Sequence, residues 1–429
     1  MCIRDSIDTD VLNGKKYYYA CVAYDEGDPN RGTKGLLPTE TTKIISESIL
    51  GEIDFIDINC AVVTPNAPVA GYVPPQVIGS LDEIASGFGS GSLAVTILNP
   101  DSVKDNASYT VKFHSNGQIP KYTTSYYELI REYGGVVDTV LERVDSTTFG
   151  AGLLGPLFDG IAVTTNNDTI GVDLEKTDWV KGFSNLYMPV RLENGFPLNK
   201  IIAWPADYEM EFLDGFTELS FNSIPINFKI KNITSGNYIQ AYIHDTDPLG
   251  YLSLGDVISF MEIYDGQKFT WTVGYYPQND GSPTPLYPSG GDIFRVVTTK
   301  PFIDGDSFTF KTVSSKIISE NVKNEMDQIS VVPNPYIAAA TWENKTISTN
   351  GRGERRIDFI NLPATCTIRI YTVAGALVKT LHKDSSPLDG SLSWNLVSED
   401  GMDVAFGLYI FHVEAPGIGD KIGKFALIK

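Results

Sequence analysis

The sequence predicts an all-β fold with several β-sandwich domains in series, and three observations lead to this prediction. From about residue 53 to residue 315, short runs of alternating apolar and polar residues are separated by Gly, Pro, Asn and Asp, as strands are by turns. The 22 Tyr and 21 Phe, together with many Thr and Val, are the composition of sheets. No segment keeps a 3.6-residue period over a normal helix length; residues 125–133 come nearest, and the Gly134-Gly135 that follows suits a hairpin equally.

Composition and charge exclude two classes of protein. The 429 residues include 33 basic and 53 acidic side chains, a net charge of −20, so the chain lacks the basic face with which proteins bind nucleic acid. Apolar residues make up 42% of the chain and charged residues 20%, which excludes a disordered acidic tail. The chain contains no apolar run of about 18 residues, so no transmembrane helix is predicted.

The N-terminal segment begins with a leader and continues as a strand pair. Residues 1–6 (MCIRDS) have neither the basic nor the apolar region of a signal peptide and resemble translated adapter sequence, so we expect them to be non-native. In the strand predicted at 16–24, four side chains share one face, namely Tyr18, Ala20, Val22 and Tyr24. A loop follows to Gly35, and a closing strand is predicted at 37–45.

Residues 7–50 thus resemble the end of a fibronectin type III domain. The resemblance implies a spacing or binding role, and it makes Tyr18 the corner tyrosine whose hydroxyl bonds to nearby backbone. An isolated strand pair cannot bury a face, so the chain is expected to be the C-terminal part of a longer protein.

Residues 51–320 are predicted to form a central β region of one or two sandwiches. Strands at 93–98 and 108–113 flank the turn Asn99-Pro100-Asp101, and further strands are expected at 226–230, 269–273 and 308–312. The pattern Tyr-x-apolar-x-Phe at 109–113 recurs at 208–212. This echo favours two related sandwiches divided near residue 160, although two short matches leave a single region open.

Residues 325–429 carry the most specific set of motifs. In order they are VVPNPY at 331–336, IDFINLP at 357–363, CTIRIYTVAG at 366–375, LVKTL at 377–381, WNL at 394–396, GMDVAFGLYI at 401–410 and GKFALIK at 423–429. Ile368 and Ile370 alternate with polar neighbours, residues 373–376 reverse the chain, and Gly407 permits a bend. These residues therefore predict a C-terminal sandwich that ends on a strand.

These motifs resemble the immunoglobulin-like C-terminal sandwich related to the flagellar hook-capping domain and to the sorting tails of the type IX secretion system. The resemblance implies an extracellular or outer cell-surface protein of a bacterium, whose C-terminal domain is read by outer-membrane secretion machinery for export and surface anchoring. Two features depart from the family pattern: Phe406 stands where Pro is common, and residues 338–355 are longer than in compact sorting tails.

The sequence shows no catalytic signature. His114, His244, His382 and His412 form no HExxH motif, and no G-x-S-x-G is present. The four cysteines, Cys2, Cys21, Cys60 and Cys366, are too far apart for a CxxC pair, and Cys21 is predicted to be buried in a strand. Residues 87–92 (GFGSGS) lack the Lys and the following helix of a phosphate-binding loop, so a flexible loop is predicted. We therefore expect no enzyme and no cofactor, while a catalytic domain upstream stays open.

Two acidic loops are candidate Ca²⁺ sites, because Ca²⁺ takes six to eight oxygen ligands from loops of this composition. The first contains Asp25, Glu26, Asp28 and Asn30, and the second contains Asp245, Asp247 and Asp256. Neither matches the pattern D-x-[DN]-x-[DN]-G. Asp and Asn also form turns with their own backbone, and this alternative explains both loops.

The five tryptophans are Trp179, Trp204, Trp271, Trp342 and Trp394. Trp271 and Trp394 lie in alternating strands and are expected in the core, whereas Trp179 and Trp204 lie nearer loops and are candidates for stacking on sugars. The function predicted is a secreted or cell-surface structural and binding protein. The alternative is a glycan- or polymer-binding module that accompanies a hydrolase encoded upstream.

Overall fold

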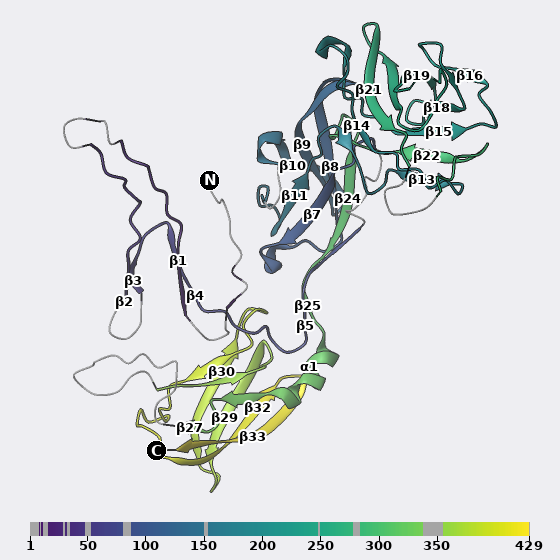
Figure 1. Ribbon diagram of the computed structural model, residues 1–429. Coiled ribbons are helices and arrows are strands. Elements are labelled where there is room, and N and C mark those ends of the chain that lie inside the picture. Colours follow the sequence, from purple (N-terminus) through teal and green to yellow (C-terminus); the bar gives the residue numbers. More distant parts are fainter. Residues whose placement is uncertain are drawn as a thin grey trace. The chain divides into compact units, whose positions relative to one another are not determined.

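The computed structural model describes residues 8, 10–11, 16–28, 31, 35–47, 53–79, 87–149, 153–247, 249–277, 284–337 and 355–428 (Figure 1). The chain divides into two compact units. The central unit comprises residues 75–314, and the terminal unit comprises the residues before and after it. The all-β prediction is confirmed: among the described residues, the single α-helix is α1 (Ser319–Glu325). Residues 1–6 lie outside the described residues.

The first lobe of the central unit packs a five-stranded sheet against a strand pair. The sheet has the order β10-β9-β8-β24-β6, and the pair is β11-β7. Their bounds are β6 (Gln76–Ile78), β7 (Ser92–Ile97), β8 (Ala107–Gln118), β9 (Lys121–Tyr133), β10 (Val136–Asp145), β11 (Ile161–Asn166) and β24 (Ser307–Val313), with the 3₁₀ turns Pro100–Ser102 and Ser146–Thr148.

The segment with the nearest approach to helical periodicity is part of strand β9. Tyr133 pairs with Val136, which leaves a two-residue turn, and both of its residues, Gly134 and Gly135, have positive φ angles of 60° and 79°. Two consecutive positive φ angles are what a type I′ hairpin turn requires and what glycine allows at least cost. The hairpin alternative is therefore confirmed.

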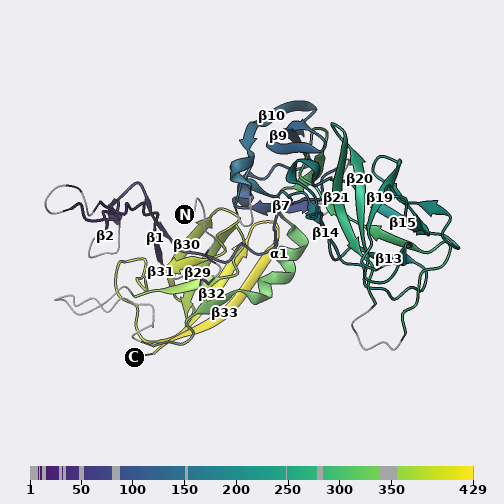
Figure 2. The same ribbon diagram turned by 45° about the horizontal axis from the view of Figure 1, so that its top comes forward.

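The second lobe is a larger sandwich that follows in the chain and returns to the first (Figure 2). Its strands have the order β13-β22-β15-β18-β19-β20-β21-β14. Their bounds are β13 (Asp178–Lys181), β14 (Val190–Leu192), β15 (Tyr208–Phe212), β18 (Phe228–Asn232), β19 (Tyr238–His244), β20 (Val257–Ile263), β21 (Gln267–Gly274) and β22 (Ile293–Val296). Short pairs are β12 (Gly171–Val172) with β23 (Thr298–Thr299) and β16 (Glu218–Leu219) with β17 (Pro225–Ile226), and a 3₁₀ turn lies at Leu198–Lys200.

The long sheet of the second lobe folds into two facing halves. Only the pairs Ile230↔Ile239 and Lys231↔Tyr238 join β18 to β19. Beyond this corner the halves face each other, since the ring of Tyr208 on β15 lies 5.1 Å from that of Phe260 on β20. Trp271 is 2% exposed in the same core, as predicted.

The structure places residues 161–166 in the first lobe, because β11 pairs with β7 along its whole length. The second lobe begins after this strand, on the C-terminal side of residue 160. The two Tyr-x-apolar-x-Phe segments are the strands β8 and β15, one in each lobe. Tyr109 and Tyr208 are both fully buried and donate hydrogen bonds to carboxylates, at 2.9 Å to Asp159 and 3.0 Å to Glu262. A repeat origin of the two lobes stays a prediction.

The terminal unit contains the C-terminal sandwich, β26 to β33. One sheet has the order β26-β28-β31 and the other β27-β33-β32-β29-β30. Their bounds are β26 (Ser330–Val332), β27 (Tyr336–Ile337), β28 (Ile357–Ile360), β29 (Thr365–Thr372), β30 (Leu377–Asp384), β31 (Leu392–Trp394), β32 (Gly407–Ala415) and β33 (Gly419–Ile428). Trp394 and Phe359 pack edge-on against Phe425 in its core. Helix α1, the 3₁₀ turn Met326–Gln328 and the pair β5 (Tyr72–Val73) with β25 (Lys316–Ile317) precede it.

The described residues before Pro65 form two small strand pairs. These are β1 (Tyr17–Ala20) with β4 (Cys60–Val63) and β2 (Ile45–Glu47) with β3 (Ile53–Ile56). The predicted role of Tyr18 is wrong, because its hydroxyl donates to the Glu47 carboxylate at 2.9 Å and not to nearby backbone. Cys21 is exposed, contrary to the prediction, because the strand ends at Ala20. None of the described residues in this segment is buried.

We expect deletion of residues 1–63 to leave the thermal stability of the C-terminal sandwich unchanged. A segment whose described side chains are not buried contributes little to the free energy of unfolding, and a change below about 0.5 kcal/mol shifts the Tm of a domain of about 100 residues by at most about 4 °C. Differential scanning calorimetry of the full and shortened chains measures the shift. A clearly larger loss would show that these residues cover part of the core.

Candidate functional site

The C-terminal sandwich is the candidate functional site, and its last strand is held on both sides. Strand β33 pairs with β32 along the whole length of β32, from Gly407↔Leu427 to Ala415↔Gly419. Its other edge pairs in parallel with Tyr336 and Ile337 at Leu427 and Ile428. Phe425 and Leu427 are buried, so the chain is anchored up to the last described residue.

Asn334, in the motif VVPNPY, extends this edge as a strand would. Its side-chain amide donates to the carbonyl of Lys424 at 3.2 Å and accepts from the amide of Ala426 at 3.1 Å. The carboxamide thus satisfies two groups that an open sheet edge would leave for another chain. The motif therefore has a local role in fastening the terminal strand.

A buried amine holds a turn of the same sandwich. Lys383 is 4% exposed, and its Nζ donates to the Asp389 carbonyl at 2.6 Å and to the Ser385 hydroxyl. Burial lowers the pKa of Lys383, and burial raises the pKa of the neighbouring Cys366 thiol to about 11. Cys366 is therefore a thiol at neutral pH, and Lys383 fastens the turn at residues 385–390.

In the first acidic loop, the carboxylate of Asp25 accepts hydrogen bonds from residues of the same segment. Its carboxylate accepts from the amides of Gly27 at 2.8 Å and Thr39 at 3.2 Å, and from the Thr39 hydroxyl at 2.5 Å. These hydrogen bonds hold the pKa of Asp25 below its usual range. Asp28 pairs with Leu36 through main-chain hydrogen bonds, Glu26 is exposed, and Asn30 lies outside the described residues.

In the second acidic loop, the deepest carboxylate is also occupied. Asp256 is fully buried and accepts from the amides of Thr246 at 2.9 Å and Ser253 at 2.8 Å. Asp247 accepts from Leu249 and Ser253, and Asp245 accepts from the amide of Asp247. Among the residues that the structure describes, no three His, Cys, Asp or Glu side chains gather as a metal-binding group. Calcium binding stays a prediction of the sequence.

We expect EDTA and added Ca²⁺ to leave the melting temperature unchanged, because the carboxylates of Asp25, Asp245, Asp247 and Asp256 already accept hydrogen bonds of these turns. Thermal unfolding in excess EDTA, then in excess Ca²⁺, measures the effect, with Mg²⁺ as the control cation. A rise in Tm specific to Ca²⁺ would establish a site, and Asp245→Asn and Asp25→Asn would then locate it.

The glycine-rich loop at 87–92 is fixed, contrary to the prediction that it is flexible. The amides of Phe88 and Gly89 donate to the carboxylate of Asp306 at 2.6 and 2.9 Å. Asp306 is 1% exposed, and it also accepts from the amide of Ile303 at 2.9 Å. A carboxylate of the chain itself thus occupies the amides that a phosphate would need.

Ser259, His244 and Glu193 come together in the second lobe, a grouping that sequence spacing did not reveal. His244 Nε2 lies 2.8 Å from the Ser259 hydroxyl, and this hydroxyl donates to Glu193. Ser259 is fully buried, and its proton is directed to the carboxylate and not to the imidazole, so it is not arranged as a nucleophile. Burial alone would raise the pKa of Glu193, but the bonds from Ser259 and the Gly195 amide outweigh it and hold the pKa low.

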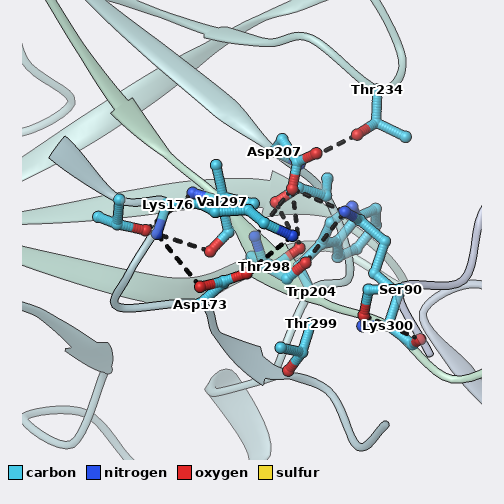
Figure 3. Close-up of polar contacts among 12 residues, drawn as sticks. Ser90, Asp173, Lys176, Trp204, Asp207, Thr234, Val297, Thr298, Thr299 and Lys300 are labelled. Atoms are coloured by element: carbon cyan, nitrogen blue, oxygen red, sulfur yellow. Dashed lines mark hydrogen bonds and ion pairs between the residues drawn. The ribbon is translucent and has the colours of Figure 1, made fainter. Parts of the chain in front are cut away.

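An ion pair between a buried lysine and a half-buried aspartate joins the two lobes of the central unit (Figure 3). Lys300 Nζ lies 2.7 Å from Asp207 Oδ1, at the start of β15 in the second lobe. The backbone of Lys300 binds Ser90, which lies just before β7 in the first lobe. The Lys300 amide donates to the Ser90 hydroxyl at 2.7 Å, and the Lys300 carbonyl accepts from the Ser90 amide at 2.9 Å. The side chain of Lys300 is 8% exposed, so its charge depends on Asp207.

Both candidate sugar-binding tryptophans pack against the core of the second lobe. The Trp179 ring centroid lies 5.4 Å from those of Phe212 and Phe294, and its indole N–H donates to the Leu186 carbonyl at 3.1 Å. Trp204 is half-buried, and its carbonyl accepts the Trp271 indole N–H at 2.9 Å. Large exposed aromatic side chains lie elsewhere in this lobe, with Phe183 93% exposed.

Comparisons with known proteins give partial structural likeness only. No protein-family model and no curated protein matches the chain. The chain is similar in part to PorZ, an essential bacterial surface component of the type-IX secretion system of Porphyromonas gingivalis, with 13% identity, a TM-score of 0.21, and coverage of 74% of this chain and 51% of PorZ. It is also similar in part to dimeric latent PorU from Porphyromonas gingivalis, with 11% identity, a TM-score of 0.17, and coverage of 95% of this chain and 41% of PorU. The chain spans about half the length of these solved chains, or less.

In the part of the chain that the structure describes, no helix is long and apolar enough to cross a membrane.

Proposed function

We propose that the chain is a secreted or cell-surface structural and binding protein of a bacterium, and that its C-terminal sandwich is an export and surface-anchoring domain. The observation that carries the proposal is the strand β33, which pairs with β32 and, at Leu427 and Ile428, also with β27, and whose Phe425 and Leu427 are buried. A strand held on both edges in this way can present a fixed surface to a partner. The motifs of this sandwich resemble type IX sorting tails, and the partner proposed is outer-membrane secretion machinery.

The other described residues support a structural and binding role and not a catalytic one. The described Ser259 hydroxyl is buried and directed to a carboxylate, and the amides of the glycine-rich loop are occupied by Asp306. The ion pair between Lys300 and Asp207 links the two lobes of the central unit. We therefore propose a non-enzymatic role for these residues, outside the cell or on its outer surface, with extracellular proteins or glycans as binding partners.

Export is tested in a bacterium that has the type IX machinery, with an epitope in the full chain and surface labelling as the readout. Deletion of residues 325–429 should prevent surface delivery, because it removes the sandwich that the machinery is proposed to bind. The matched control is deletion of residues 1–63, none of whose described residues is buried, and it should not affect delivery. Circular dichroism confirms that the central unit of the shortened chain folds, and equal surface labelling of the chain without residues 325–429 and the full chain would refute the proposal.

A further inference from the structure

Residues 67–73 (APVAGYV), here called the strap, lie in the terminal unit and complete the C-terminal sandwich. The amide of Val69 donates to the Pro387 carbonyl at 2.9 Å, and the amide of Gly390 donates to the Ala67 carbonyl at 2.7 Å. The amide of Ala70 donates to the Leu362 carbonyl at 3.1 Å. Val69 and Ala70 are 2% and 3% exposed, so the strap is a buried part of the fold.

The C-terminal end of the strap is fastened to helix α1. The amide of Gly71 donates to the Glu325 carboxylate at 2.7 Å, and the Gly71 carbonyl accepts from the amide of Ile318 at 3.0 Å. Gly71 has a φ of +76°, and a Cβ there would lie 2.8 Å from the Ile318 carbonyl oxygen and 2.9 Å from the Val322 nitrogen. Only glycine both adopts this positive φ readily and lacks the Cβ that would collide with helix α1. Tyr72 and Val73 then pair with β25.

The sandwich also requires a glycine where it contacts the strap. A Cβ on Gly390 would lie 2.3 Å from the Pro68 carbonyl oxygen, so any side chain there would displace the strap. Gly390 lies in the turn that Lys383 fastens through the Asp389 carbonyl. Lys383 therefore holds the turn whose main chain forms hydrogen bonds with Ala67 and Val69.

The strap and the C-terminal sandwich are separated in sequence by the whole central unit. We propose that the strap is a clasp, which keeps the C-terminal sandwich bound to the rest of the protein when the backbone is cut between the central unit and β25. Main-chain hydrogen bonds supply the attraction, as in the addition of a strand to a sheet edge, and the two small buried side chains supply the fit. The inference is independent of export, because it concerns the purified protein alone.

The test uses the full chain with a site for a specific protease inserted between Ser314 and Ser315. Cleavage places the strap on one fragment and residues 315–429 on the other. Sedimentation velocity over a range of concentrations then measures their association. We expect one sedimenting species in native buffer and two in urea. Two separate species in native buffer at every concentration would overturn the proposal.

Variants show whether the strap is responsible. Gly390→Ala should raise the dissociation constant of the cleaved fragments at least about tenfold, and Glu325→Gln should raise it by a smaller factor. The control is Gly375→Ala in the same sandwich, where an added Cβ meets no atom within 4 Å. Gly375 has a φ of +84° and Gly390 has no positive φ, so the control carries the backbone strain of a substitution without the clash. Circular dichroism before cleavage checks that each variant folds. Should Gly390→Ala and Glu325→Gln both bind as tightly as Gly375→Ala, the strap would not be the clasp.

Discussion

Replacement of Asp207 by alanine is expected to lower the free energy of unfolding of the central unit by about 3 kcal/mol, because it leaves the buried Lys300 amine without its carboxylate. Lys300 Nζ would keep only its hydrogen bond to the Thr298 carbonyl, at 3.1 Å, in a side chain that is 8% exposed. The same substitution removes the acceptor of the Thr298 amide, 2.8 Å from Asp207 Oδ1. Urea denaturation followed by tryptophan fluorescence measures the change.

Two further variants separate the charge from the hydrogen bond. Asp207→Asn keeps an acceptor for Thr298 but removes the negative charge, and it should still be strongly destabilising. In the double variant Asp207→Ala, Lys300→Met, no buried charge is left without its partner, so part of the stability should return. A loss below 1 kcal/mol in Asp207→Ala would show that Lys300 finds water or another partner when the pair is broken.

Trp179→Ala is expected to destabilise the second lobe by about 3 kcal/mol, because truncation of a packed tryptophan leaves a cavity. The ring lies between Phe212 and Phe294, and its N–H bond to Leu186 is lost with it. The matched control is Phe183→Ala, whose side chain is 93% exposed and which should change stability by less than about 0.5 kcal/mol.

The same pair of variants tests the glycan-binding alternative. A glycan array probed with the wild type, Trp179→Ala and Phe183→Ala separates a structural role of Trp179 from a binding role. Loss of a measured glycan signal in Trp179→Ala, with stability unchanged, would contradict the packing role and establish the sugar-binding role. We expect the opposite: lower stability, and no glycan signal that depends on Trp179.

The fold class and many of the strands could be predicted because alternation and turn residues are local signals. Residues 108–113, 269–273 and 408–413 all lie in strands of the structure. Gly134 and Gly135 identify their hairpin because two adjacent positive φ angles demand glycine. Helix α1 was not predicted, because its seven residues are shorter than the length over which helical periodicity can be detected.

The partners of individual side chains could not be predicted, because they are set by contacts distant in sequence. Asp306 holds Phe88 and Gly89, and no local pattern connects residues so far apart. The glycine-rich composition of that loop therefore gave a wrong prediction of flexibility. Trp179 illustrates the same limit: proximity to loop residues such as Gly182 says nothing of the rings of Phe212 and Phe294, which come from other strands.

The pairing of β6 with β24 has a consequence for the order of folding. Gln76 and Val313 are partners in this pair, so a folded central unit holds its two ends about 5 Å apart. The strap and the C-terminal sandwich then need to close only a short effective loop, which greatly reduces the entropy cost of their long sequence separation. Folding should therefore proceed from the middle of the chain outward, and the terminal unit should close only after the last strand has been synthesised.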